Sequence, residues 1–358
     1  MRKTKVMIIS TVGLIYDGIT SVILSYLRVM DLSNIDIYIA GTIKVEPTIK
    51  MELETLGCSI VDLPSRREKP ALYFLALTAF LRQNNVDIIH AHGNSATLAI
   101  ELMAGLLGGC KKRIAHSHNT RCDQIYIDKI LRPLFYHLYT DALACGQDAG
   151  EWMFAGNSFT IIKNGRDFKQ FTFNREIRDE MRARYGIKDE LVIGHVGGFV
   201  EQKNHRFLLD VYREIHKIEP TAKLFLIGDG VLRKEIERLA SDLEEVLIFT
   251  SNVDNVPDYL QMMDGMLLPS LFEGFPLVVV EWQINGIPAL VSDTIDRACA
   301  ITDLVKFMSL QEPASTWAKE MLRWCNRRAA VSEVDLDSVR KAGFDIRKEV
   351  DKLERLYR

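Results

Sequence analysis

Short apolar runs alternate with amphipathic stretches along nearly the whole chain, and this alternation constrains the fold more than any other feature. Short runs of this kind are typical of strands that are buried on both faces, and the stretches between them are typical of helices that cover a parallel sheet. The alternation stops near residue 163 and restarts near residue 191. We therefore predict an α/β protein with two doubly wound domains.

The predicted elements follow from the positions of the apolar runs. In the first half, the predicted strands are residues 6–10, 35–40, 87–91, 113–116, 142–145 and 159–162, and predicted helices include 19–30, 71–84 and 96–107. In the second half, the predicted strands are residues 191–196, 223–227, 246–249, 265–268 and 289–291. Asn164-Gly165 marks a turn, and residues 168–174 are predicted to be an irregular connector.

Composition excludes several classes of protein. A chain of 358 residues with 47% hydrophobic and 26% charged residues is typical of a globular enzyme with two cores. The net charge of −3 argues against nucleic acid as the main partner. The six cysteines are scattered without a CxxC pair, which indicates reduced thiols and a cytoplasmic setting. An uninterrupted apolar segment of about 18 residues is absent, so no membrane span is expected.

The segment EGFPLVVVE holds two carboxylates, Glu273 and Glu281, with seven residues between them. Gly274 allows a ligand to approach the backbone closely, and Pro276 suits the first turn of a helix predicted at residues 278–283. The amides at the start of that helix can receive anions or hydroxyl groups. Both carboxylates could face one polyhydroxylated ligand. The alternative is a capped, buried helix with two solvated glutamates.

Glycines follow several predicted strands, at residues 13–18, at Gly197-Gly198 and at residues 228–230. Such loops can bring backbone amides to phosphates, although ordinary βα turns also contain glycine. Lys203 follows Gly198 by five residues and is either a diphosphate ligand or a solvated lysine. GxGxxG and GxxxxGK[ST] are both absent, which argues against a dinucleotide-binding or P-loop enzyme.

Two histidine pairs, His90 with His92 and His116 with His118, fall at the carboxyl ends of predicted strands. The first interpretation is a metal site, since imidazole suits zinc, but no Asp or Glu ligand lies beside them and HExxH is absent. The second interpretation is one functional histidine with the others in structural hydrogen bonds. We favour the second and predict no metal. The Asp335-Leu336-Asp337 motif is interpreted as two solvated acids.

Basic residues at 66–69 and 111–113 offer a further hypothesis. Together with Tyr73, Phe74 and Leu77, they could form a patch that contacts anionic lipids. The alternative is that they are ordinary solvated faces.

Taken together, these motifs resemble those of the retaining glycosyltransferases of the GT-B fold, in the large family 4, and the resemblance covers nearly the whole chain. EGFPLVVVE is similar to the E-x7-E signature of that family, and NGIPALVSD is similar to its G-x-P segment. GGFVEQKNH, LIGDG and IIKNGRD resemble its glycine–lysine loop, its strand–glycine segment and its hinge. DIIHAH and HSHNT resemble its acceptor-side histidines.

The resemblance implies roles for individual residues. Glu273 would contact donor-sugar hydroxyls and Glu281 the ribose, while Lys203 would bind the diphosphate. His118 would lie near the anomeric centre, with His116 as the second candidate, so the implied catalytic residues are His118 and Glu273. The implied donor-binding residues are Gly18, Gly198, Lys203, Gly228, Gly230, Gly274, Phe275, Pro276, Leu277 and Glu281. The implied acceptor-side residues are His90, His92, His116 and Asn164.

The chain departs from the family pattern at four positions. Gly198 stands where the family has an arginine, and Asn204 stands where it has a glycine. Pro276 replaces a frequent glycine, and Gly18-Ile19 replaces a double glycine. The departure at Gly198 removes one bidentate cation from the diphosphate site, for which Lys203 or Arg206 could compensate.

We expect a cytoplasmic, metal-independent, retaining glycosyltransferase whose two Rossmann-like domains face a central cleft. Residues 1–167 would bind the acceptor, residues 175–335 would bind a nucleotide-sugar, and a C-terminal helix at about 340–358 would pack on the first domain. The expected donor is a UDP-linked hexose or N-acetylhexosamine, and no other cofactor is expected. The expected acceptor is a saccharide or lipid-linked saccharide of surface polysaccharide, with peripheral membrane contact at the inner face.

Two alternatives use the same architecture. A UDP-N-acetylglucosamine 2-epimerase would need several carboxylates around the sugar and would act without an acceptor. A non-catalytic, glycosyltransferase-like partner subunit would bind a nucleotide without turning it over.

Overall fold

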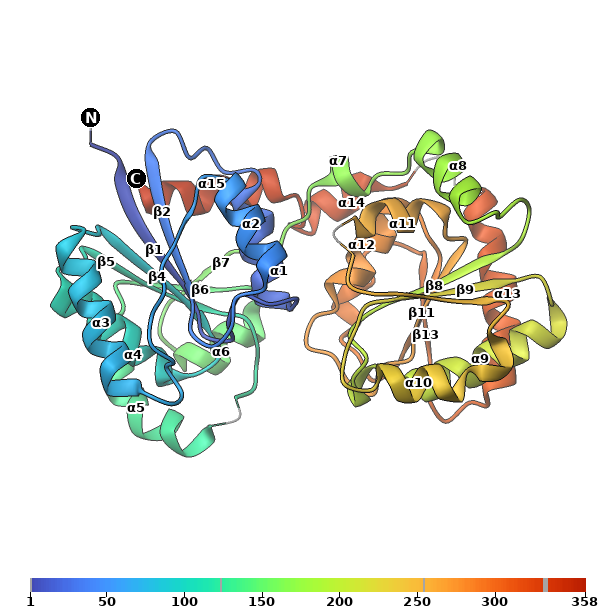
Figure 1. The fold of residues 1–358 in the computed structure, drawn as a ribbon, viewed down its shortest axis with the longest axis horizontal. Helices are drawn as coiled ribbons and strands as arrows, with labels where there is room; N and C mark the ends of the chain where they lie inside the picture. Colours follow the sequence, from blue (N-terminus) through green and yellow to red (C-terminus); the bar gives the residue numbers. More distant parts are fainter. Residues whose placement is uncertain (1, 123, 254, 331–333) are drawn as a thin grey trace. The chain divides into compact units, whose positions relative to one another are not determined.

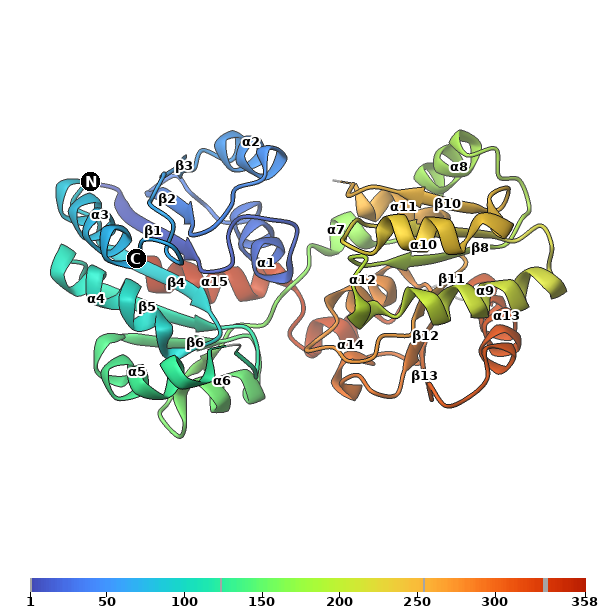
Figure 2. The same cartoon turned by 60° about the horizontal axis from the view of Figure 1, so that its bottom comes forward.

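The chain forms two compact units, each built on a parallel sheet (Figures 1 and 2). The computed structural model describes residues 2–122, 124–253, 255–330 and 334–358. The first unit comprises Met1–Gly165 together with Asp345–Arg358, and the second comprises Arg166–Phe344. The predicted α/β class with two doubly wound halves is confirmed.

The first unit has a seven-stranded sheet with the strand order β3-β2-β1-β4-β5-β6-β7. Its strands are β1 (Thr4–Ser10), β2 (Ile35–Gly41), β3 (Ser59–Ile60), β4 (Ile88–Gly93), β5 (Lys112–Ser117), β6 (Asp141–Ala144) and β7 (Thr160–Ile161). Its helices are α1 (Gly18–Leu27), α2 (Pro47–Thr55), α3 (Pro70–Gln83), η1 (Ala96–Leu98), α4 (Ala99–Gly108), α5 (Ile125–Leu138), α6 (Gln147–Phe154) and α15 (Ile346–Tyr357).

The second unit has a six-stranded sheet with the strand order β10-β9-β8-β11-β12-β13. Its strands are β8 (Val192–Val196), β9 (Lys223–Ile227), β10 (Leu247–Thr250), β11 (Gly265–Leu268), β12 (Ala289–Ser292) and β13 (Val305–Met308). Its helices are α7 (Phe168–Phe171), α8 (Arg175–Arg184), η2 (Glu201–Lys203), α9 (His205–Ile218), α10 (Arg233–Leu239), η3 (Ser241–Leu243), α11 (Val256–Met262), α12 (Leu277–Asn285), η4 (Arg297–Cys299), α13 (Ala314–Ala330) and α14 (Leu336–Lys341).

The strand order of each sheet reverses direction at one point. In the first unit, the chain proceeds outward from β1 through β2 and β3, and then returns to the other side of β1 as β4. In the second unit, β8 and β11 are related in the same way. At such a switch point the loops after neighbouring strands diverge and leave a crevice at the carboxyl edge of the sheet, where ligands bind.

Both faces of the second sheet are buried, as the apolar runs predict. In β9, Phe225 and Ile227 pack in one apolar cluster, and Leu224 and Leu226 pack in another. The alternation between clusters follows the two-residue period of a strand. This explains why these strands read as continuous apolar sequence.

Three segments differ from the sequence-based expectations. The strands β3 and β13 were not predicted, because β3 has only two residues and β13 is an edge strand whose residues are all only partly buried. The connector predicted at residues 168–174 contains the short helix α7. Asp167 caps this helix by accepting a hydrogen bond from the amide of Lys169.

The last helix, α15, packs within the first unit. Gly343, with φ +85°, follows the end of α14, and the Asp345 carboxylate caps α15 by accepting from the amide of Arg347. The helix buries Ile346, Val350 and Leu353 together with Tyr357. Residues 336–344 belong to the second unit, so the helix that packs on the first unit is shorter than the expected segment at 340–358.

The lipid-contacting patch proposed from the sequence is wrong in part. Tyr73 and Leu77 of α3 are fully buried in the core of the first unit. Arg66 is bound by the buried carboxylate of Glu101, with Nε 2.6 Å from Oε1. Among the described residues, no helix is both long and apolar enough to cross a membrane.

Candidate functional site

Three loops meet at the carboxyl edge of the second sheet, after the neighbouring strands β9, β8 and β11. The amide of Gly197 donates to the carbonyl of Ile227, and the amide of Phe199 donates to the carbonyl of Asp229. The loop after β11 is joined to the loop after β8, because the amide of Leu271 donates to the carbonyl of Gln202. The structure therefore brings together the glycine loops that the sequence singled out.

The glycines of these loops differ in how strongly they are required. Gly228 has φ +141°, and a Cβ atom there would lie 2.3 Å from the carbonyl oxygen of Gly197. A Cβ atom on Gly230 would lie 2.6 Å from the carbonyl oxygen of Phe199. Gly198 is different, because its Cβ would meet only the carbonyl oxygen of Asp229, at an ordinary 3.5 Å. Sterics thus demand glycine at 228 and 230 but permit a side chain at 198.

Lys203 and Glu273 form an ion pair at this edge, with Nζ 2.5 Å from Oε1. The same oxygen of Glu273 accepts a hydrogen bond from the hydroxyl of Ser270 at 2.8 Å. Its Oε2 atom accepts one from the side-chain amide of Gln202 at 3.1 Å. The pair is largely buried, which strengthens the attraction relative to an exposed pair. Two side chains to which the resemblance gives separate roles are thus in direct contact.

Asn204 occupies a left-handed backbone conformation, with φ +55°. Asparagine tolerates this region better than other residues with a Cβ. Its side-chain amide also donates to the carbonyl of Pro269. The replacement of the family's glycine by Asn204 therefore keeps the turn from η2 into α9.

The helix α12 begins after Pro276, which supplies no side-chain cap for the first amides of the helix. Those amides remain suited to an anion or hydroxyl ligand. Gly274 is exposed, Leu277 is the first residue of the helix, and Phe275 stacks on Phe344 with a ring separation of 5.3 Å.

Glu281 lies within α12 and is buried against Arg166, with Oε1 2.6 Å from Nε. Burial raises the pKa of Glu281, and the ion pair with Arg166 opposes this shift. Glu281 and Glu273 thus have separate cationic partners. The partner of Glu281 could not be predicted from local sequence patterns, because 115 positions separate Glu281 from Arg166.

Two further histidines, His195 and His205, lie beside the glycine loop and were missed by the sequence-based reasoning. His195 Nδ1 lies 2.9 Å from the carbonyl oxygen of Leu267, and the ring of His205 stacks on Phe199 at 4.2 Å. Burial, with a smaller contribution from Lys203, lowers the pKa of His205 to about 4. A buried neutral ring beside the lysine leaves Lys203 as the cation of this loop. The only signal in the sequence was their position next to the glycine pair.

In the first unit, the four predicted histidines form a two-by-two array at the carboxyl ends of β4 and β5. His90 and His116 share a hydrogen bond of 3.1 Å, and His92 and His118 share one of 2.8 Å. The rings stack along each strand, with centroid separations of 4.1 Å in β4 and 4.3 Å between His116 and His118. Tyr357 of α15 adds a hydrogen bond of 2.6 Å to His90 Nδ1.

The array favours neutral imidazoles. Burial lowers the pKa of His118 to about 3, and burial together with the neighbouring rings lowers the pKa values of His90, His92 and His116. Among the described residues, the Nε2 atom of His116 and the Nδ1 atom of His118 have no hydrogen-bond partner. Both atoms are themselves buried, so a bound molecule could reach them only if neighbouring groups moved.

Metal binding by this array would require rearrangement. The candidate ligand atoms of His90, His92 and His116 lie within 4.8 Å of one another. However, one nitrogen in the bond between His90 and His116 must carry a proton and so cannot coordinate a metal. The stacked, hydrogen-bonded arrangement suits a polar network better than a metal centre.

The remaining predicted residues of the first unit lie near its loops. Gly18 is the first residue of α1, and a Cβ atom added to it would have no neighbour within 4 Å. Gly13, with φ +97°, is the sterically demanding glycine of this loop, because a Cβ there would lie 2.8 Å from the carbonyl oxygen of Lys44. Asn164 is half-buried and its Oδ1 has no hydrogen-bond partner.

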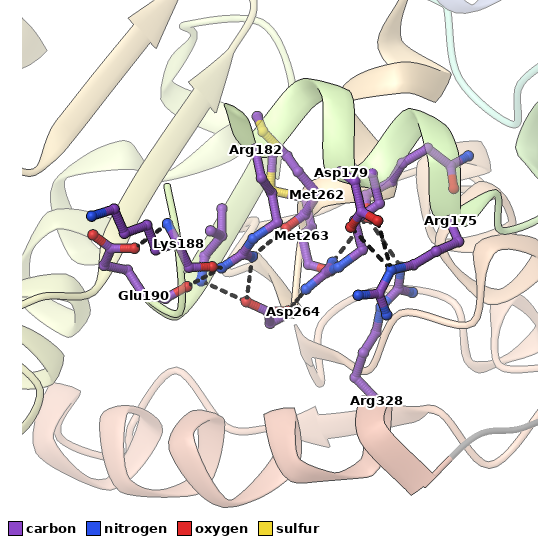
Figure 3. A network of polar contacts seen from close by, with 12 residues as sticks. Arg175, Asp179, Arg182, Lys188, Glu190, Met262, Met263, Asp264 and Arg328 are labelled. Atoms are coloured by element: carbon purple, nitrogen blue, oxygen red, sulfur yellow. Dashed lines mark hydrogen bonds and ion pairs between the residues drawn. The ribbon is translucent and has the colours of Figure 1, made fainter. Parts of the chain in front are cut away.

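A network of arginines at the opposite edge of the second sheet is not part of this site (Figure 3). Asp264, just before β11, accepts from Arg178 at 2.5 Å and from Arg182 at 3.3 Å. Arg182 also donates to the carbonyls of Lys188 and Glu190. A cavity of about 1380 Å³ opens beside the network. These guanidinium groups already bind protein oxygens, so we assign them a structural role.

The chain is similar to known glycosyltransferases. A family model described as "Glycosyl transferases group 1" matches residues 190–326. EpsF of Bacillus subtilis (strain 168), provisionally named a glycosyltransferase, is 31% identical over 363 residues, covering 96% of this chain and 94% of EpsF. The UDP-Gal:alpha-D-GlcNAc-diphosphoundecaprenol alpha-1,3-galactosyltransferase of Escherichia coli is 22% identical over 301 residues, covering 79% of this chain and 78% of that enzyme.

The fold also has a solved counterpart. A crystal structure of Anabaena Alr3699/HepE in complex with UDP-glucose matches with a TM-score of 0.78 and 16% identity, covering 98% of both chains. This likeness confirms the predicted GT-B fold class.

Proposed function

Because the chain belongs to the glycosyl transferases group 1 family, we propose that it transfers a hexose or N-acetylhexosamine from a nucleotide-sugar to a saccharide or lipid-linked saccharide. The reaction retains the anomeric configuration of the sugar and contributes to surface polysaccharide. The observation that carries the proposal is the largely buried Lys203–Glu273 pair among the glycine loops of the second unit. The positive charge of such a pair can bind the diphosphate of a nucleotide-sugar, and the negative charge can accept hydrogen bonds from the hydroxyls of the sugar.

The donor is a UDP-sugar that binds at the carboxyl edge of the second sheet. Lys203 binds the diphosphate together with the amides around Gly198, Gly230 and the start of α12, which supply dipoles where negative charge develops on the leaving group. Glu273 accepts hydrogen bonds from sugar hydroxyls, and Glu281 from the ribose. The UDP-glucose complex of the HepE structure and the UDP-Gal named for the Escherichia coli relative support the choice of nucleotide.

The acceptor binds at the histidine array of the first unit. By the family resemblance, His118 is the proposed catalytic residue of the array, and its Nδ1 atom is buried without a hydrogen-bond partner among the described residues. A neutral imidazole can accept a hydrogen bond from an acceptor hydroxyl without itself carrying a positive charge. The diphosphoundecaprenol named for the Escherichia coli relative supports a lipid-linked acceptor. The enzyme works in the cytoplasm and contacts the inner face of the membrane peripherally.

A thermal-shift screen followed by a transfer assay tests the proposal. UDP-sugars should raise the melting temperature more than GDP- and ADP-sugars, because ligand binding stabilises the folded state by mass action. Transfer with the best donor to a lipid-linked acceptor should give a product with the donor's anomeric configuration, read by proton NMR. Binding without transfer to any saccharide acceptor, or an inverted product, would reject the proposal.

Metal independence has its own test. Activity should persist after treatment with EDTA, since the proposed leaving-group stabilisation uses Lys203 and backbone amides. Loss of activity that zinc restores would instead indicate that the histidine array holds a metal.

A further inference from the structure

The outer face of the first unit carries an unusual concentration of exposed apolar side chains. The helices α3, α4 and α5 lie side by side as one layer (Figures 1 and 2). The large apolar side chains that this layer exposes are Leu72, Leu75, Leu106, Leu107, Ile125, Tyr126, Ile127, Ile130 and Leu134. Single exposed apolar residues are ordinary, but this number on three adjacent helices indicates a binding surface.

A shallow apolar groove is lined by all three of these helices. Its lining includes Phe74 of α3, Met103 of α4 and Leu134 of α5, and its volume is about 270 Å³. The groove therefore joins apolar side chains of the three helices and includes the exposed Leu134. We call the exposed side chains of α3, α4 and α5 together the outer face.

The charges of the outer face have one sign. The three helices, all of whose residues the structure describes, contain two acidic residues, Glu101 and Asp128. Both are buried and ion-paired, Glu101 with Arg66 and Asp128 with Arg132.

The exposed charged residues on the helices themselves are Arg82 and Lys129. Arg67, Lys69 and Lys111 are exposed immediately beside the helices, with Glu68 as one acid among them. An apolar surface edged by cations complements a surface with an apolar interior and anionic headgroups, where lysine and arginine reach outward from the apolar layer.

The position of the outer face matches an acceptor that comes from such a surface. The loop after β5 carries His118 and leads within seven residues to Ile125, the first residue of α5. The most exposed apolar residue of the layer, Tyr126, is 84% exposed and lies in the first turn of α5. The histidine array and one end of the outer face therefore adjoin each other within the first unit.

A second copy of the chain is a less suitable occupant. In a two-fold symmetric dimer the same patch faces itself, so Lys69 and Lys129 would be placed in an interface of one sign. Like charges across an interface oppose association. An anionic lipid surface has the opposite sign and needs no matching shape.

We propose that the outer face of α3, α4 and α5 docks the protein on an anionic lipid surface. Ile130, Tyr126 and their apolar neighbours enter the boundary between headgroups and acyl chains. Lys69 and Lys129 bind lipid phosphates. The surface is defined by side chains of the first unit alone and does not depend on the proposed glycosyl transfer.

Vesicle flotation with the full chain tests this surface. The wild type should float with phosphatidylcholine vesicles that contain phosphatidylglycerol, and much less with phosphatidylcholine alone. The side chain of Ile130 is 76% exposed in the free protein. Ile130→Glu should lower the partition coefficient by about ten-fold or more, because the isoleucine that would be buried in the lipid is lost. The double change Lys69→Glu with Lys129→Glu should lower binding to the anionic vesicles by about ten-fold or more while binding to phosphatidylcholine stays weak.

Met51→Glu is the matched control. Met51 is 65% exposed on α2, outside the outer face, and its replacement should change the partition coefficient by no more than about two-fold. Equal binding of Ile130→Glu and wild type, or no flotation of the wild type with anionic vesicles, would overturn the proposal. So would a wild-type dimer in light scattering that Ile130→Glu converts to a monomer.

A transfer assay with a soluble acceptor in the absence of vesicles separates this proposal from the proposed function. Ile130→Glu should keep wild-type rates there. Flotation of the wild type without any transfer would support the lipid-binding surface and reject the enzyme assignment. Transfer without flotation would support the enzyme assignment and reject the lipid-binding surface.

Discussion

Glu273 is held by three protein groups, and any ligand that it binds must compete with them. Lys203, Ser270 and Gln202 all donate to its carboxylate. A bound diphosphate would attract Lys203, and a sugar hydroxyl would take the place of a protein donor. The pair is therefore interpreted as a resting arrangement whose charges stay balanced until a donor arrives.

Replacement of either Lys203 or Glu273 should impair the site, partly because the remaining residue loses its ion-pair partner. Glu273→Ala should lower kcat/KM, because a polar contact to the donor is lost. The expected loss of transition-state stabilisation is about 2–4 kcal/mol. Lys203→Ala should chiefly raise the KM for the donor. Because the two side chains are in contact, the double variant should lose less than the sum of the single losses.

Steady-state kinetics on the four proteins of this cycle measures the coupling. Glu201→Ala is the matched control, since Glu201 lies in the same loop but is exposed and bound to Arg206. Wild-type kinetics in Glu273→Ala, or strictly additive losses, would contradict the assigned roles.

The loop has room for an arginine at Gly198, which is the residue that the family pattern has at this position. A Cβ there has only an ordinary contact with Asp229, so Gly198→Arg should fold normally. The added guanidinium should tighten binding of UDP by about ten-fold or more, the value of a charged hydrogen bond to a phosphate. Isothermal titration with UDP checks this result.

Gly228→Ala gives the steric contrast at the same edge of the sheet. Its φ of +141° and the 2.3 Å approach to Gly197 predict a loss of stability of about 1–3 kcal/mol, measured by urea unfolding. If Gly198→Ala were equally destabilising, the steric distinction between the two glycines would be wrong.

At the scale of elements, α15 is tied to the histidine array by one side chain. Tyr357 is fully buried and shares a hydrogen bond with His90. Glu349 of the same helix accepts from the amide of Lys163. The helix thereby supports both the array and the end of the first unit's main segment.

Tyr357→Phe should lower the free energy of unfolding by about 1–3 kcal/mol, because it leaves a buried imidazole nitrogen without its partner. Urea unfolding measures the loss. Tyr126→Phe is the matched control, since its hydroxyl is on an exposed side chain and should matter little. Equal effects of the two changes would show that the buried hydrogen bond contributes nothing.

The elements also show what could be predicted from the sequence. Runs such as Lys223–Ile227 are apolar because both sheet faces are buried, so the strands and the glycine loops after them could be located. The short strand β3 and the edge strand β13 have little buried surface and gave no such signal. The membrane patch was misplaced because Tyr73 and Leu77 point to the core, which periodicity alone did not separate from the exposed face.

The candidate site was only partly predictable for a related reason. Residue types and loops could be identified from local spacing, which is why Lys203 and Glu273 were singled out. Their contact with each other, and the pair of Glu281 with Arg166, join positions that are distant in sequence. Local patterns carry no information on such partners, so the roles of these residues remain predictions.

At the scale of the whole molecule, buried neutral histidines predict a stability that depends on pH. The pKa of His118 is lowered to about 3 and that of His205 to about 4, whereas an unfolded histidine titrates at about 6.5. Below that value the unfolded chain binds more protons than the folded chain. The stabilisation is complete above pH about 6.5 and is lost as the pH falls, by up to about 1.4 kcal/mol per pH unit for each such histidine.

Urea midpoints measured at a series of pH values from neutral to mildly acidic check this expectation. His205→Gln removes one titrating ring and should make the decline of the second unit's stability shallower. A midpoint that is constant over this range, or an unchanged slope in the variant, would contradict it.

The division of the chain sets an order for its maturation on the ribosome. The first unit is composed of Met1–Gly165 and Asp345–Arg358, with the whole second unit between them. During translation the histidine array must wait, without Tyr357, until residues 166–344 have been synthesised. The strands of both units precede α15 in the chain, so the second unit can be complete while the first unit still lacks its last helix. A nascent chain in which residues 166–344 have left the ribosomal tunnel while residues 345–358 are still inside it would thus carry a finished second unit and a first unit that is sensitive to protease because α15 is missing.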